Sequence, residues 1–113
     1  MCAASHAEGY STYASSKYAH AEGVETIAQG GEGAHAEGNL TKATGTTSHA
    51  EGIKTVASGF ASHAEGYQTS ATISAAHAEG YLTYAKGEYS HAEGNQTSAI
   101  GKYSHAQGEK TKA

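Results

Sequence analysis

The tetrapeptide His-Ala-Glu-Gly recurs along this 113-residue chain at an almost constant spacing. It begins at residues 6, 20, 35, 49, 63, 77 and 91, and it returns as His-Ala-Gln-Gly at residue 105. Successive copies start 14 residues apart, except for one step of 15 residues between His20 and His35. A fixed period of this kind indicates a repeat architecture, in which each unit stacks on its neighbours.

Within each repeat, small residues alternate with other residues in two short stretches. The unit reads [Ser/Ala]-His-Ala-Glu-Gly-x-x-Thr-x-Ala-x-Gly-x-x. Alternation with a period of two is typical of β-strands, and glycine allows a positive φ where the first strand ends. A coiled coil is excluded because glycine interrupts every unit and no apolar seam is present. The sequence therefore predicts an all-β protein, a parallel β-roll (β-solenoid) of about eight 14-residue coils with two short strands per coil.

The repeat covers the whole chain, so we expect a single domain over residues 1–113. The extra residue of the 15-residue coil falls around residues 29–33, where a bulged turn is expected to leave the strands in register. The last coil is incomplete, which predicts that the sequence is a segment of a longer fibre.

Period-two alternation directs only alanine, serine and threonine toward the interior of the roll. Such side chains bury little apolar surface, so an isolated roll is not expected to offset the entropy lost on folding, and an oligomer is predicted. The first strand directs a column of histidine and glutamate outward. This predicted axis ladder comprises His6, Glu8, His20, Glu22, His35, Glu37, His49, Glu51, His63, Glu65, His77, Glu79, His91, Glu93, His105 and Gln107.

The ladder is almost invariant within the chain, whereas the outward positions of the second strand differ from coil to coil. Tyr13, Lys42 and Tyr84, for example, occupy equivalent second-strand positions. Variation is compatible with solvent exposure, and invariance at every rung predicts contact with other chains around a rotational axis parallel to the roll. Pairing of each histidine with a glutamate is expected to raise the histidine pKa and lower the glutamate pKa, with stability highest between about pH 4.5 and 6.5.

The repeated residues bear on several possible functions. Eight equivalent rungs offer no unique arrangement of nucleophile and base, so the chain is not expected to be an enzyme. Histidine and glutamate two residues apart could bind Zn²⁺ or Ni²⁺, but a glutamate beside each histidine can satisfy it without a metal, and neither metal nor cofactor is predicted. Ice binding by the threonine column is disfavoured because threonine shares parity with the inward alanines. Exposed Tyr13 and Tyr84 are the candidates for contact with a glycan, while Tyr10, Tyr18, Tyr67, Tyr81, Tyr89 and Tyr103 are expected to pack between protomers.

Composition excludes two classes of partner. A net charge of −4 provides no basic surface for nucleic acid. No apolar run of about 18 residues is present, so no membrane contact by this segment is expected.

The unit Ser-x-Ala-x-Gly-x-x-Thr-x-Ala-x-Gly resembles the head repeat of trimeric autotransporter adhesins, the YadA-like head, and Ser-His-Ala-Glu-Gly repeats of phage tail fibres are similar. The resemblance implies a left-handed β-roll that assembles side by side as a parallel homotrimer. It also implies an extracellular location, on a bacterial outer-membrane adhesin or a virion tail fibre, and a structural or adhesive function toward a host-surface receptor, protein or glycan. A ligand-binding module that uses the ladder for metal or the tyrosines for glycan is the alternative. The family usually places apolar residues where this chain has histidine and glutamate, which implies a polar trimer axis.

Overall fold

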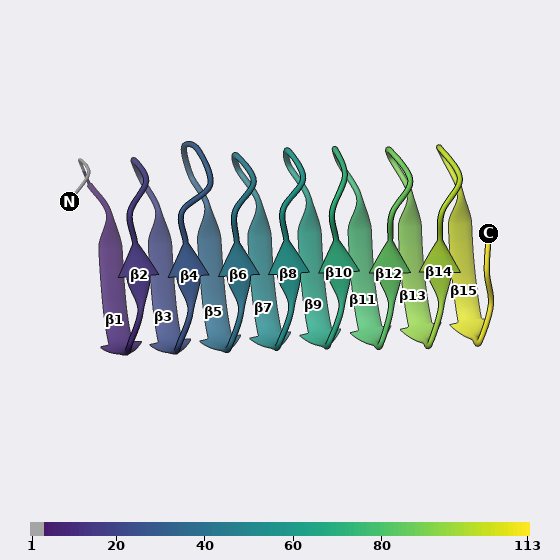
Figure 1. The fold of residues 1–113 in the computed structure, drawn as a ribbon, viewed down its shortest axis with the longest axis horizontal. Helices are drawn as coiled ribbons and strands as arrows, with labels where there is room; N and C mark the ends of the chain where they lie inside the picture. The colour runs from purple at the N-terminus through teal and green to yellow at the C-terminus, as the bar shows by residue number, and fades with distance from the viewer. Residues whose placement is uncertain (1–3) are drawn as a thin grey trace.

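A computed structural model describes residues 4–113, and these residues form a parallel β-solenoid of about seven turns, with about 14 residues per coil. Its Cα atoms span 41 × 22 × 10 Å, so the roll is long and thin, with two layers of strands (Figure 1). The described residues include no helix, and therefore none that could cross a membrane. The last coil is incomplete: its second strand is reduced to one bridge, between Ser98 and Lys112.

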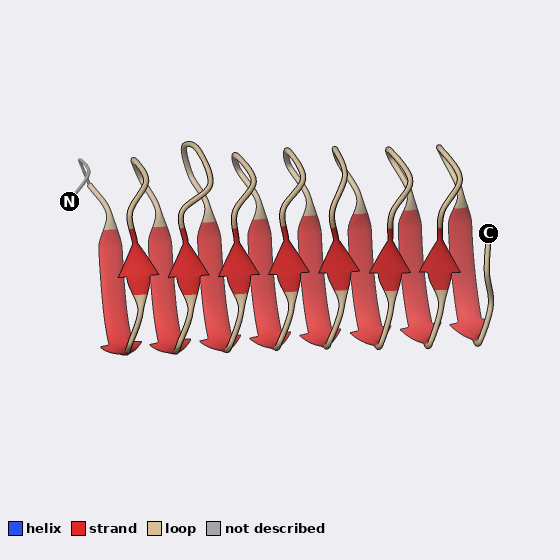
Figure 2. Cartoon of the chain, in the orientation of Figure 1, coloured by secondary structure: helices blue, strands red, loops and turns tan. Residues whose placement is uncertain are grey.

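The first layer is a sheet of eight five-residue strands that carry the repeated tetrapeptide (Figure 2). Neighbouring strands are parallel and pair identical positions of consecutive repeats, such as His49 with His63 and Glu51 with Glu65. The strands are β1 (His6–Tyr10), β3 (His20–Val24), β5 (His35–Asn39), β7 (His49–Ile53), β9 (His63–Tyr67), β11 (His77–Tyr81), β13 (His91–Asn95) and β15 (His105–Glu109).

The second layer is a sheet of seven two-residue strands that are also parallel. Each contributes one outward residue and one inward alanine, as in the pairing of Ser70 and Ala71 with Tyr84 and Ala85. The strands are β2 (Tyr13–Ala14), β4 (Ile27–Ala28), β6 (Lys42–Ala43), β8 (Val56–Ala57), β10 (Ser70–Ala71), β12 (Tyr84–Ala85) and β14 (Ser98–Ala99).

The core between the layers consists of the predicted small residues. Ala50 and Ala57 are fully buried, as are Thr55 and the equivalent residues of the inner coils. No fully buried side chain of the described residues is larger than threonine, which is why the two layers can lie so close together. The predicted inward parity is therefore confirmed, and the burial of the threonine column removes the surface that ice binding would need.

The extra residue of the second coil is absorbed in a turn, as predicted. The turn spans residues 30–33 and forms the larger loop between β4 and β5 in Figure 1. The backbone N–H of Gly33 donates to the Lys17 carbonyl at 3.0 Å, and His20 still pairs with His35. The insertion changes the length of the turn and leaves both sheets in register.

The glycine that follows each ladder glutamate has a positive φ, as expected; Gly52, for example, has a φ of +111°. A different reason applies to the glycine of the second turn. Gly45 has no positive φ, but a Cβ there would lie 2.1 Å from the carbonyl oxygen of Gly59 in the next coil. The left-handed residue of that turn is Thr47, two positions later, and the corresponding residue of the first turn is Leu40. Both turns therefore place non-glycine residues in the left-handed region, which the sequence pattern did not reveal.

Candidate functional site: the histidine–glutamate ladder

The outward face of the long-strand sheet carries one continuous column of imidazoles and one of carboxylates. The in-register pairing of identical residues stacks consecutive imidazoles with ring centroids 4.5–4.9 Å apart. From His35 onward the rings are within 5° of parallel. The side chains of His49 and Glu51 remain 35% and 32% exposed, so the face is half-buried in a single chain. The structure thus places every predicted ladder residue on one face.

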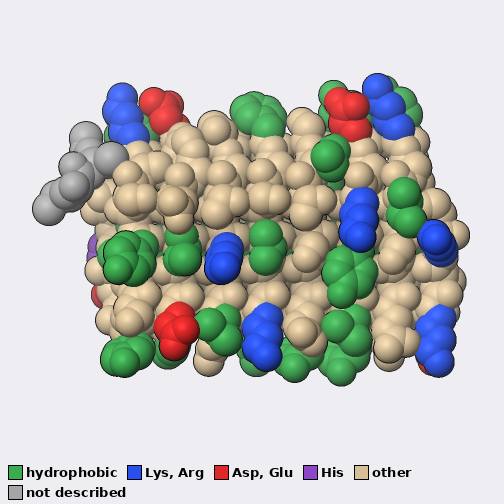
Figure 3. All heavy atoms as spheres, in the orientation of Figure 1, with side chains coloured by type: hydrophobic (Ala, Val, Ile, Leu, Met, Phe, Trp, Pro, Cys, Tyr) green, Lys and Arg blue, Asp and Glu red, His purple; other side chains and the backbone are tan. Residues whose placement is uncertain are grey.

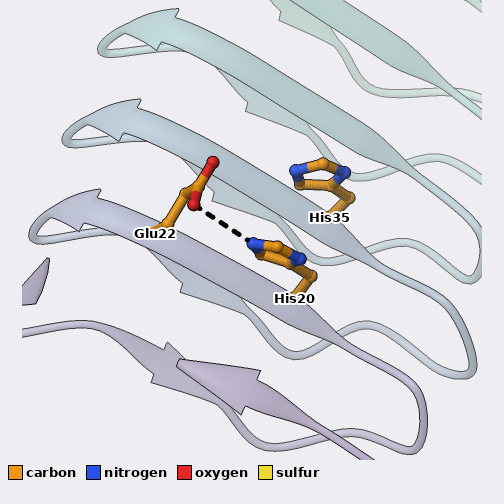
Figure 4. Close-up of side chains that lie close together, drawn as sticks. All are labelled: His20, Glu22 and His35. Atoms are coloured by element: carbon orange, nitrogen blue, oxygen red, sulfur yellow. Dashed lines mark ion pairs between the residues drawn. The ribbon is translucent and has the colours of Figure 1, made fainter. Parts of the chain in front are cut away.

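Each ladder histidine except His105, whose strand has Gln107, lies beside the glutamate of its own strand at a distance longer than an ordinary N–H···O hydrogen bond. Nε2 of His20 is 3.4 Å from Oε2 of Glu22, and Figure 4 shows the ring edge directed at that carboxylate, with His35 on the next strand. The same pair in the other strands, where both residues are present, is 3.6–3.8 Å apart. The enclosed Nε2 atoms without a hydrogen-bond partner belong to His20, His35, His49, His63, His77 and His91. The prediction that glutamate satisfies each histidine is therefore wrong for these residues.

The inner glutamates also approach the histidine of the following strand. Oε1 of Glu65 is 3.9 Å from Nε2 of His77, and Oε1 of Glu79 is 3.6 Å from Nε2 of His91. Histidine and glutamate consequently alternate in one chain of contacts from His49 to His105. The expected pKa shifts rested on one glutamate for each histidine, whereas the in-register strands also give each residue like neighbours one strand away.

These like neighbours reverse part of the expected electrostatics. Partial burial lowers the pKa of His35, His49 and His77 below 6.5, and the adjacent imidazoles lower it further. The expected rise in the histidine pKa is therefore wrong for these three residues, because desolvation and like charge outweigh the attraction of glutamate.

The carboxylates share protons along their column. Hydrogen bonds to neighbouring carboxylates and burial raise the pKa of Glu37 and of Glu65 to about 7. Hydrogen bonds from these protonated neighbours lower the pKa of Glu22 and Glu51, and they lower that of Glu79 to about 2. The expected fall is thus confirmed for Glu22, Glu51 and Glu79 and wrong for Glu37 and Glu65. Adjacent carboxylates in this part of the column cannot all ionise near neutrality, so Glu37 and Glu65 tend to retain a proton there.

We expect the stability of the metal-free protein to fall between pH 6 and pH 8 as Glu37 and Glu65 lose their protons. Their folded-state pKa of about 7 lies above the ordinary 4.5, so the stability that they contribute is complete below pH 4.5 and is lost as the pH rises through about 7. The histidines with lowered pKa contribute stability that is lost as the pH falls below 6.5, and they cannot cause a fall above neutrality. Solvent screens these carboxylates, whose side chains are 34% and 33% exposed, so we expect a fall of about 1–2 kcal/mol.

Urea unfolding at both pH values, with chelator present, measures this fall. Glu37→Gln/Glu65→Gln should largely abolish it, because the Gln amide donates the hydrogen bond of a protonated carboxyl at every pH. Glu25→Gln/Glu88→Gln, which removes the same charge away from the ladder, should retain it. An equal fall in both variants would contradict the proton-sharing column.

A groove runs beside the carboxylate column along the entire ladder. It is open to solvent, has a volume of about 1350 Å³, and extends from Glu8 and Gly9 to Gln107 and Gly108. The groove exists because the residue after each ladder glutamate is glycine, whose missing side chain leaves the backbone uncovered. The sequence analysis assigned these glycines to chain reversal alone and missed their role in shaping the surface.

The two tyrosines proposed for external contact do not form one site. Tyr13 on β2 is 64% exposed, whereas Tyr84 on β12 is half-buried, and Nζ of Lys86 lies 5.2 Å from the centre of its ring. β2 and β12 are separated by four strands of the short-strand sheet. Figure 3 views this side of the molecule, where hydrophobic, basic and other side chains are interspersed.

The remaining tyrosines occupy the two edges of the ladder face. Tyr10, Tyr67 and Tyr81 end their strands, and the rings of Tyr67 and Tyr81 stack at 5.1 Å. Tyr18, Tyr89 and Tyr103 each lie two residues before a ladder histidine, so period-two alternation assigns them to the outward side of the first strand, but the structure places them in the preceding turn with a φ of about +60°. That assignment is wrong because each long strand begins only at its histidine.

Comparison with known proteins identifies no relative of this chain. No protein-family model matches it, and neither does any curated protein or solved structure.

Proposed function

We propose that this chain is a structural and adhesive segment of a fibre, in which three left-handed β-rolls pack in parallel with their ladder faces toward the threefold axis. The observation that supports this proposal most strongly is the difference between the two faces. The ladder face repeats the same residues and encloses imidazole nitrogens that have no hydrogen-bond partner, whereas the short-strand face varies from coil to coil. Solvent does not require such regularity, but contact with identical neighbouring chains does.

The register of the ladder favours a parallel arrangement about an axis. Because each rung adds one histidine and one glutamate at the strand spacing, parallel chains at the same height would bring equivalent residues together on every rung, with their strands running in the same direction around the axis. The core provides a second reason for assembly. It contains no buried side chain larger than threonine among the described residues, so burial of the exposed edge tyrosines, such as Tyr81 and Tyr89, between chains would add apolar contact that one roll lacks.

The course of the chain supports the left-handed sense. In Figure 1 the short strands lie nearer the viewer and run upward, the long strands run downward behind them, and the chain advances from left to right. Viewed along its axis from the N-terminal end, such a coil turns counterclockwise as it moves away from the viewer, which is the left-handed sense.

The adhesive part of the proposal concerns the short-strand faces, which a trimer would leave outward. The face extends over about seven turns, and a trimer would present each of its weak contacts in three copies, whose combination would raise avidity for a receptor. The receptor would be a protein or glycan on a host surface, and the fibre would belong to a bacterial cell surface or a virion tail. Exposed Tyr13 offers an aromatic ring for glycan contact. A catalytic role is not proposed, because equivalent rungs provide no singular arrangement of reactive groups.

Sedimentation equilibrium should give a mass of about 35 kDa, three times the chain mass of 11.5 kDa. Glu51→Lys/Glu65→Lys places cations beside the imidazoles of the proposed axis and should yield monomer or unfolded protein. The control Glu25→Lys/Glu88→Lys makes the same change in charge away from the ladder and should remain trimeric. A wild-type chain that is folded and monomeric would overturn the assembly.

A further inference from the structure

The enclosed imidazole nitrogens lie at a distance from carboxylate oxygens that suits two ligands of one metal ion. Zn²⁺ binds imidazole nitrogen and carboxylate oxygen at about 2.1 Å, so two such ligands are roughly 3.4 Å apart at a tetrahedral angle and roughly 3.8 Å apart at a wider one. Nε2 of each ladder histidine with a glutamate in its own strand is 3.4–3.8 Å from that carboxylate. These separations exceed a hydrogen bond and match the geometry of a bridging cation.

Two stacked histidines cannot share the ion. Two bonds of about 2.1 Å span at most roughly 4.2 Å, whereas the parallel rings of His63 and His77 have centroids 4.8 Å apart. The second carboxylate is better placed, because Nε2 of His91 is 3.6 Å from Oε2 of Glu93 and 3.6 Å from Oε1 of Glu79. His63 and His77 have the same pair of carboxylate neighbours, at 3.7–3.9 Å.

We propose that the ladder face binds Zn²⁺, each ion being held by Nε2 of one histidine and by carboxylate oxygens of the glutamates in the same and the preceding strand. The three complete ligand sets are His63 with Glu51 and Glu65, His77 with Glu65 and Glu79, and His91 with Glu79 and Glu93. An imidazole ligand favours transition-metal ions over Mg²⁺ and Ca²⁺. A water molecule would complete the fourth coordination position of the zinc ion. All three protein ligands come from one chain, so this site does not rest on the proposed trimer.

The spacing of the rungs limits how many zinc ions can bind to the ladder at the same time. The sets at His63 and His77 share Glu65, and the sets at His77 and His91 share Glu79. Dications on adjacent rungs would also repel each other four times as strongly as unit charges at the same distance. Alternate rungs therefore fill first, at His63 and His91, which predicts about two tightly bound ions per chain.

Equilibrium dialysis of the chelator-stripped protein against ZnCl₂, with the bound metal measured by mass spectrometry, tests this site. We expect about two zinc ions per chain and a visible absorption spectrum of bound Co²⁺ that shows nitrogen and oxygen ligands. Glu65→Gln/Glu79→Gln/Glu93→Gln should weaken binding by roughly tenfold or more, because removing a direct ligand costs at least as much as removing its support. The structure accommodates glutamine on the ladder, since Gln107 pairs in register with Glu93.

Glu25→Gln/Glu32→Gln/Glu88→Gln removes the same charge from turns away from the ladder and should bind zinc as the wild type does. His63→Gln/His91→Gln should also lose the Co²⁺ spectrum, which provides a second test if the first variant fails to fold by circular dichroism. Much less than one zinc ion per wild-type chain would overturn the site, as would equal binding by the ladder and control variants. Sedimentation of the same samples reports the trimer separately, so failure of one proposal does not decide the other.

Discussion

Replacing Gly52 with alanine is expected to unfold the solenoid or to lower its free energy of unfolding by roughly 3–6 kcal/mol. Gly52 has a φ of +111°, a region that residues with a Cβ rarely adopt, and this strain alone costs about 1–3 kcal/mol. A Cβ would also lie 2.1 Å from the carbonyl oxygen of Gly66 in the next strand. That oxygen belongs to a backbone in register on both sides, so it cannot move without disturbing the neighbouring rungs.

Alanine substitutions at two other glycines distinguish the cost of the backbone strain from the cost of the close contact with the next strand. Gly108 has a similar φ of +113°, but the nearest atom to an added Cβ would be Cγ2 of Thr111 at 3.6 Å, so Gly108→Ala should incur only the strain. Gly101 has neither a positive φ nor a close neighbour, and Gly101→Ala should change stability by less than about 1 kcal/mol. Urea unfolding of the three variants measures their free energies of unfolding, which should be lowest for Gly52→Ala, intermediate for Gly108→Ala and highest for Gly101→Ala. If Gly52→Ala is no worse than Gly108→Ala, the close approach between strands is not what requires glycine.

Replacing Ala50 with leucine is expected to destabilise the roll by about 3 kcal/mol or more, because the core has no space for a larger side chain. Ala50 is fully buried, and it pairs in register with Ala36 on one side and Ala64 on the other. A branched side chain there must separate the two sheets, and the sheets are joined by short turns on both edges.

Val56→Thr provides the control, because Val56 lies on the partly exposed outward side of β8. We expect that substitution to change stability by less than about 0.5 kcal/mol. Thermal and urea unfolding measure both variants. Equal effects at the two positions would contradict the inward and outward assignment of the strands.

The β-solenoid fold could be predicted from the sequence because every repeat shows the same alternation of small inward residues and other outward residues. Period-two alternation placed Ala50 and Thr55 in the core, and the constancy of the unit predicted that His20 and His35 would pair despite the extra residue between them. These predictions depend only on which side of a strand a residue faces. Because the units are alike, the side assigned to a position in one unit holds for the same position in every other unit.

The turns and the ladder electrostatics could not be predicted in the same way. Tyr18 and Leu40 adopt left-handed conformations that their residue types do not favour, because closure of each coil imposes them. The raised pKa of Glu37 comes first from its hydrogen bond with Glu51 on the next strand, and the lowered pKa of His49 comes first from burial and then from the imidazoles of His35 and His63 on the adjacent strands. Reasoning within one repeat treats each histidine and glutamate as an isolated pair, whereas the structure makes them members of two columns.

Because similar units stack in register, the length of the molecule is set directly by the number of repeats. Every unit pairs with the one before it through the same positions, so a whole repeat could be duplicated or deleted by recombination with little change to the contacts of the alanine and threonine core or of the inner ladder. Each such event would change the length by one strand spacing of about 4.8 Å and leave the cross-section unchanged. The turn at residues 30–33 shows that a single residue can be gained without loss of register, provided that it falls in a turn. The length of such a solenoid can therefore evolve in small equal steps, independently of the chemistry of its faces.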